Sequence, residues 1–89
     1  MENKNKSSKA VALTYDGEKD RAPRVMAKGS GSIADKIIEI AKQHDIPLVK
    51  DKNLVQVLEA LDLETEIPPE LYQAVAEVLA FIYRLNNKL

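Results

Sequence analysis

Residues 24–41 read RVMAKGSGSIADKIIEIA, and this stretch decides the fold class. Residues 24–28 are a β-type segment, and the Gly-Ser-Gly-Ser sequence at 29–32 ends it and opens a helix. Ser32, with Asp35 three residues later, resembles a capping box. The apolar residues that follow recur at helical spacing: Ile33, Ile37, Ile40 and Ala41. The stretch therefore predicts a strand, a tight turn and an amphipathic helix.

A second strand is predicted at residues 10–15, where apolar side chains alternate at Val11, Leu13 and Tyr15. Asp16-Gly17 is a turn signal, and the short loop to Arg24 favours an antiparallel hairpin. Residues 1–9 are polar and lysine-rich, so we expect a flexible arm there and a single domain over 10–89.

Two further helices and another strand are predicted after the first helix. That helix should end near His44, because Pro47 disfavours helical geometry at the preceding residue. Residues 47–50 then read as a short strand, which we expect to pair in parallel after the crossover helix. Asp51 caps a helix over about 52–61, and Pro68-Pro69 starts the longest helix. The fold class is therefore α/β, with a small mixed sheet of three to four strands packed with three to four helices.

The composition excludes several classes of protein. The chain has 89 residues, no cysteine and a formal net charge of −1. A disulfide framework and Cys-ligated metal are therefore excluded, and a strongly basic nucleic-acid binder is disfavoured. No apolar run approaches the roughly 20 residues that a membrane helix needs.

The sequence contains little that points to catalysis. His44 is the only histidine and the chain has no cysteine, so neither a metal site nor a catalytic dyad has a second such residue. We expect His44 to lie at a helix C-terminus, where a partly charged imidazole interacts favourably with the helix dipole. The glycines of 29–32 lack both the Walker and the GxGxxG patterns, so we interpret them as a turn. The hairpin-loop carboxylates (Asp16, Glu18 and Asp20) lack an EF-hand pattern. We expect no enzyme activity, no metal and no cofactor.

Apolar residues lie on more than one face of the last helix. The core stripe runs through Leu71, Val75, Val78 and Ile82, whereas Tyr72, Ala76, Leu79 and Tyr83 lie at different angles. This second face has two interpretations, as further core or as a surface that binds a partner.

Several segments, in order and spacing, resemble one family. These are AVAL at 10–13 before Tyr-Asp, Ala22-Pro23 followed by VMAKG at 25–29, IPLV at 46–49, and ELY at 70–72. From Ala10 to Leu85 the chain is similar to the cytoplasmic C-terminal domain of the FlhB/YscU/SpaS family. Members of that family are export-gate proteins of flagellar and virulence type III secretion systems.

The chain departs from the family pattern in its N-terminal part. Family members carry membrane helices and a strand ahead of this domain, and an Asn-Pro-Thr-His motif at which they cleave themselves. Here the corresponding residues are Asn5, Lys6, Ser7 and Ser8, so the proline and the histidine are replaced. We expect no self-cleavage, and we expect one edge of the sheet to be open to an added strand.

The resemblance implies a substrate-binding patch at Ala22, Pro23, Ala76 and Leu79. It implies a cytoplasmic, non-catalytic paralogue that binds rod- and hook-type export substrates or export-apparatus proteins, and that binds no nucleic acid. Such a protein would either substitute for the gate's own domain or compete with it and modulate the switch in substrate specificity. The alternatives are a vestigial self-cleaving domain and an interaction adaptor unrelated to export.

Overall fold

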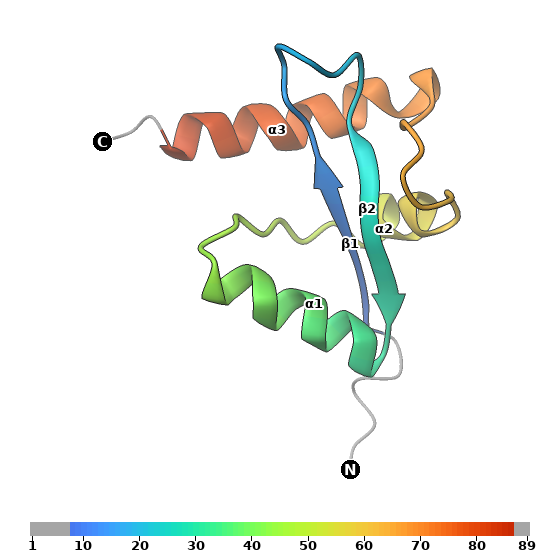
Figure 1. The fold of residues 1–89 in the computed structure, drawn as a ribbon, viewed down its shortest axis with the longest axis vertical. Helices are drawn as coiled ribbons and strands as arrows, with labels where there is room; N and C mark the ends of the chain where they lie inside the picture. Colours follow the sequence, from blue (N-terminus) through green and yellow to red (C-terminus); the bar gives the residue numbers. More distant parts are fainter. Residues whose placement is uncertain (1–7, 87–89) are drawn as a thin grey trace.

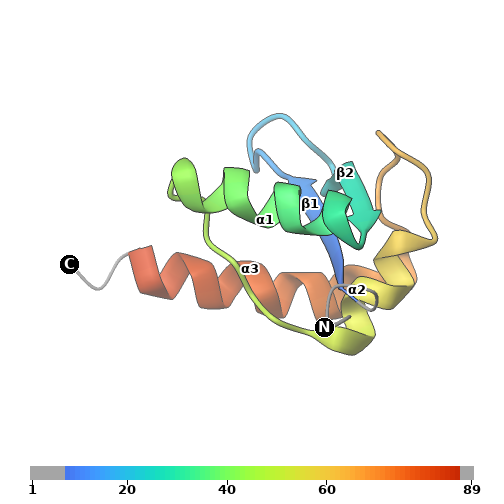
Figure 2. The same cartoon turned by 90° about the horizontal axis from the view of Figure 1, so that it is seen from below.

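The computed structural model describes residues 8–86, which form a β-hairpin packed between helices. In order along the chain the elements are β1 (Lys9–Thr14), β2 (Arg24–Ser30), α1 (Ser32–Gln43), α2 (Lys52–Glu59), the 3-10 turn η2 (Pro69–Leu71) and α3 (Tyr72–Asn86). Helix α1 covers one face of the hairpin, whereas α2 and α3 lie on the other (Figures 1 and 2). The described residues therefore form three layers, with the hairpin in the middle.

A bulge in the hairpin puts one extra residue into β2 and leaves Val25 and Lys28 on the same face. Ala12 pairs with Ala27 but Leu13 pairs with Val25, so Met26 is an extra residue without a partner across the ladder. Directly opposed residues share a face, which puts Val25 and Lys28 on the same side of β2. In a regular strand two residues three positions apart would face opposite sides.

The face of the hairpin toward α1 consists of small residues. The opposed pairs on that side are Ala12 with Ala27 and Ala10 with Gly29. In α1, Ala34 and Ala41 are buried. Small side chains on both surfaces let the helix approach the strands closely.

The turn into α1 depends on glycine geometry and not on a serine cap. Gly31 is the N-cap residue, with φ 62° and ψ −130°, and no side chain caps the helix. The predicted capping box at Ser32 is therefore wrong, because Gly31 adopts a backbone conformation that other residues rarely take and moves the helix start by one residue. A Cβ on Gly29 would also meet Ile33 Cβ at 2.9 Å.

The third strand predicted at 47–50 is absent. Within residues 8–86 the sheet has only β1 and β2, which pair antiparallel, so the predicted mixed sheet of three to four strands is wrong. Residues 46–50 form an exposed, irregular segment between α1 and α2. Their composition is typical of a strand. However, such a composition only suits a residue for a half-buried sheet surface, and a strand also needs a neighbouring strand with which to form hydrogen bonds. Three α-helices and one 3-10 turn are present within residues 8–86, in line with the expected three to four helices.

The free edge of β2 forms main-chain hydrogen bonds with residues 64–67, in the connector that precedes α3. Val25 N–H donates to Thr65 O at 3.1 Å, and Ile67 N–H donates to Pro23 O at 2.9 Å. Glu66 forms an isolated antiparallel bridge with Arg24. These main-chain bonds hold the end of the connector against the start of β2.

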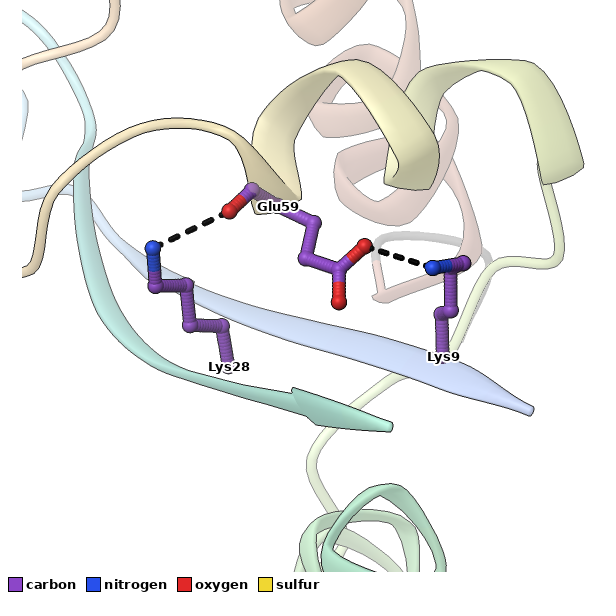
Figure 3. Close-up of polar contacts among 3 residues, drawn as sticks. All are labelled: Lys9, Lys28 and Glu59. Carbon is purple, nitrogen blue, oxygen red and sulfur yellow. Dashed lines mark hydrogen bonds and ion pairs between the residues drawn. The ribbon is translucent and has the colours of Figure 1, made fainter. Parts of the chain in front are cut away.

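Helix α2 is capped at both of its ends, and its C-terminal end is bonded to the hairpin. At its start the Asp51 carboxylate accepts the Leu54 N–H at 3.0 Å, as predicted from the sequence. At its end Lys28 Nζ donates to the carbonyl of Glu59 at 3.0 Å, and Lys9 Nζ lies 2.8 Å from Glu59 Oε1 (Figure 3). Lysine at a helix C-terminus satisfies carbonyls that have no partner within the helix.

The main core lies between the hairpin, α2 and α3. Its buried members are Ala22, Leu58, Ile67 and Val75, with Val11, Leu13, Leu54, Leu61, Leu71 and Leu79 packed around them. No helix in the described part of the chain is both long enough and apolar enough to span a bilayer.

The predicted arm at 1–9 overlaps the fold at its last residue, because β1 begins at Lys9. Residues 1–7 of that arm lie outside the described residues. Ser8 is described, and its carbonyl accepts the Gly31 N–H at 2.9 Å.

Candidate binding pocket

An apolar pocket of about 370 Å³ lies where the β1–β2 loop, the connector and α3 meet. Its floor consists of buried residues, namely Ala22, Pro23, Ile67 and Val75. Its helical wall consists of Tyr72, Ala76 and Leu79, and its loop rim of Tyr15 and Arg21. Figure 1 shows the loop between β1 and β2 beside the N-terminal half of α3. The volume is within the range of small ligand sites.

Local structure explains how these distant segments meet. The bond from Ile67 N–H to Pro23 O joins the connector to the end of the loop. Pro68 and Pro69 then begin the turn into α3, where a missing N–H costs no helical hydrogen bond. The α3 residues at the pocket have the spacing i, i+3, i+4 and i+7, which places them on one helix face: Tyr72, Val75, Ala76 and Leu79.

The four residues predicted for the binding patch all line this pocket, but they do not lie at the same depth. Ala22 is only 1% exposed and belongs to the core cluster, and Pro23 is also buried. Ala76 is exposed and Leu79 is half-buried. Ala22 and Pro23 therefore form the floor, and Ala76 and Leu79 are the residues that a ligand would meet first.

Four of the lining residues belonged to no predicted binding surface: Tyr15, Arg21, Ile67 and Val75. Tyr72 was predicted on the second face of the last helix, together with Ala76 and Leu79. Tyr72 and Val75 could be placed on α3 by their helical spacing, but the sequence does not say which helix face meets the loop. Ile67 lies at the pocket because its main-chain N–H donates to Pro23 O. A main-chain bond of that kind cannot be predicted from the pattern of side chains.

The loop that forms the rim is held by its own carboxylates. Asp16 Oδ1 accepts the Glu18 N–H at 3.0 Å, and Asp20 Oδ2 accepts the Asp16 N–H at 2.8 Å. Such side-chain bonds stabilise a turn without secondary structure. The rim is therefore a defined turn, and Arg21 follows it directly.

The other residues singled out in the sequence lie away from this pocket. His44 is the exposed C-cap residue of α1 and does not line the pocket. Among residues 8–86 no cluster of three or more His, Cys, Asp or Glu side chains could hold a metal ion. Asn5, Lys6 and Ser7 of the altered cleavage motif lie outside the described residues.

Comparison with known proteins shows to which family this chain is related. The model of the FlhB HrpN YscU SpaS family matches residues 4–82. The chain belongs to the FlhB HrpN YscU SpaS family. The protein YlqH of Bacillus subtilis is 47% identical over 81 residues, which cover 91% of this chain and 87% of YlqH.

Larger family members contain this domain as one part. The flagellar biosynthetic protein FlhB of Aquifex aeolicus is 47% identical over 81 residues, which cover 90% of this chain but only 23% of that protein. The cytoplasmic domain of FlhB from Shewanella putrefaciens superposes with a TM-score of 0.83 at 38% identity, covering 89% of this chain and 62% of that domain. This chain thus has the fold of a FlhB cytoplasmic domain and spans about a quarter of a whole FlhB.

Proposed function

We propose that this chain is a non-catalytic adaptor of type III protein export that acts in the cytoplasm. In this proposal it binds rod- and hook-type export substrates through the pocket between the β1–β2 loop and α3. Its membership of the FlhB HrpN YscU SpaS family supports a place in export. The pocket supports a binding role within it.

One observation carries the proposal. The patch residues that the family resemblance implies come from two regions far apart in the sequence, and all four line one apolar pocket: Ala22, Pro23, Ala76 and Leu79. An apolar pocket with few polar groups is a common form of binding site. Its floor belongs to the core, so a ligand side chain would pack directly on the core cluster.

The proposal excludes self-cleavage as the function of this chain. The sequence at Asn5 to Ser8 lacks the proline and the histidine of the family's cleavage motif. The pocket itself contains no histidine, cysteine or carboxylate among its lining residues.

A matched pair of variants on α3 tests the binding role. Ala76→Asp puts a charge on the exposed pocket wall, whereas Ala74→Asp puts the same charge on an exposed position that does not line the pocket. We expect Ala76→Asp to weaken the binding of purified rod and hook subunits at least about tenfold, since a carboxylate must be desolvated there. We expect Ala74→Asp to bind like the parent chain. Equal binding by both variants would contradict the proposal.

Two versions of the adaptor role differ in the cell. If the chain substitutes for the gate's own domain, supplying it restores export to a strain whose gate protein lacks that domain. If it competes instead, overproduction reduces rod and hook export in a strain with an intact gate, and the Ala76→Asp variant has no such effect.

A further inference from the structure

The pocket carries one formal charge, and that charge is positive. Of its nine lining residues, all in the described part of the chain, eight are uncharged and the ninth is Arg21. Tyr15 on the loop rim and Tyr72 on the helical wall each bear a hydroxyl group and are each 45% exposed. The pocket therefore combines an apolar floor with a rim that is polar and cationic.

The guanidinium of Arg21 has a weak partner. Its Nη2 lies 3.7 Å from Glu66 Oε1, well beyond the roughly 2.7–2.9 Å of a charge-assisted hydrogen bond. The Arg21 side chain is 87% exposed, and residues 8–86 give it no other ion pair. A guanidinium has five N–H donors, so most of them face water and can donate to another carboxylate.

Two aspartates of the loop are committed to other bonds. Asp16 and Asp20 accept main-chain N–H groups within the turn, and Asp20 also lies 3.9 Å from Arg24 Nη2. Glu66 is therefore the one described carboxylate paired with Arg21, and it is the group that an incoming acid would displace.

Occupation of the pocket changes the electrostatics of Arg21. A ligand that covers the rim removes water from the guanidinium, and desolvating a charge without a partner is unfavourable. A carboxylate on the ligand offsets this loss, and a guanidinium can bind it through two parallel N–H···O bonds. A neutral or basic group at the same place does not.

We propose that the pocket selects a peptide segment in which an acidic residue flanks an apolar anchor, with Arg21 binding the carboxylate while the anchor occupies the apolar floor. This inference rests on the proposed function, because it specifies the chemistry of the segment that the same pocket binds. It assigns a specificity role to Arg21 and a competing role to Glu66.

Three short fluorescent peptides test this selection. They share one leucine anchor, and the flanking residue is Glu, Gln or Lys. We expect the Glu peptide to bind about threefold to tenfold more tightly than the Gln peptide at low salt, with the Lys peptide weakest. At about 0.5 M NaCl the difference should largely disappear because exposed charges are screened.

Variants of the two charged residues sharpen the test. Arg21→Gln should remove the preference for Glu, and its high exposure leaves the fold intact. The control Arg84→Gln changes an exposed arginine of α3 that does not line the pocket, and should keep the preference. Glu66→Gln should strengthen binding of the Glu peptide, because the competing carboxylate is gone.

The outcomes separate this inference from the proposed function. If the three peptides bind equally and Ala76→Asp weakens all of them, the pocket is a docking site but the selection of an acid is wrong. If Arg84→Gln removes the preference as fully as Arg21→Gln does, the assignment to Arg21 is wrong. If no peptide binds at all, the pocket does not select such a segment and this inference is wrong, whereas the proposed function fails only if Ala76→Asp leaves the binding of rod and hook subunits unchanged.

Discussion

Lys28 donates a hydrogen bond from Nζ to the main-chain carbonyl of Glu59, across 3.0 Å. The same ammonium group also donates to the carbonyl of Leu61, just beyond the end of α2. A strand residue thus closes the C-terminus of a helix far away in the sequence, from the face of β2 that also carries Val25.

Replacement of this lysine should destabilise the domain. Lys28→Met keeps the aliphatic stem but leaves two partly buried carbonyls without their donor, so we expect a loss of about 1–3 kcal/mol in the free energy of unfolding. Urea denaturation measures this value. Lys36→Met, at an exposed position of α1, is the control and should change it by no more than about 0.5 kcal/mol. Equal effects of the two substitutions would remove the helix-capping role of Lys28.

A methyl group at Gly29 should disturb the packing of α1. The added Cβ would lie 2.9 Å from Ile33 Cβ and still closer to Ile33 Cγ2, so the start of the helix must shift. We expect Gly29→Ala to cost about 1–3 kcal/mol in thermal unfolding experiments. Gly17→Ala is the matched control, because its nearest contact is Tyr15 Cε2 at 3.7 Å. Adding Ile33→Ala to Gly29→Ala should recover part of the loss, and no recovery would argue against this clash.

The floor and the wall of the pocket should respond differently to the same charge. Ala22→Asp buries a carboxylate at a position that is 1% exposed, so we expect it to lower the free energy of unfolding by about 3 kcal/mol or more. Ala76→Asp lies at the surface and should change it by no more than about 0.5 kcal/mol. Circular dichroism during urea unfolding compares the two. A fully stable Ala22→Asp protein would show that this position is not part of the core.

The chain should remain intact over time. Asn5 is followed by Lys6 and not by proline, and Ser8 stands where the family has histidine, so the groups associated with self-cleavage are missing. We expect intact-mass spectrometry to find only the 89-residue chain after days at neutral pH. A new fragment beginning at Lys6 would restore the alternative of a self-cleaving domain.

Sequence reasoning located the elements better than their partners. The hairpin, the three helices and the Asp51 cap follow from alternation, helical spacing and turn residues, which are local properties. The strand predicted at 47–50 failed because composition does not provide a neighbouring strand, and the pairing of Ile67 with Pro23 was missed because main-chain bonds carry no side-chain signature. The Ser32 cap failed because the backbone of Gly31 starts the helix instead.

The candidate site, too, could be predicted only in part. Two pairs of residues were predicted from the family resemblance, and the fold brings them to one pocket. Their depth could not be predicted, because Ala22 and Ala76 are the same residue type and only the packing around them makes one floor and the other wall. Arg21 was not predicted, because only the folded chain brings this loop residue to the same pocket as Tyr72, Ala76 and Leu79.

Met26 occupies a position that the inside–outside pattern of the hairpin does not need. If it were deleted, Val25 and Lys28 would be separated by one residue and would still share a face in a regular strand. What the extra residue contributes is local twist, and twist sets the direction in which a strand leaves the sheet. Deleting Met26 would therefore keep the core residues on their present faces and remove the extra local twist at the start of β2.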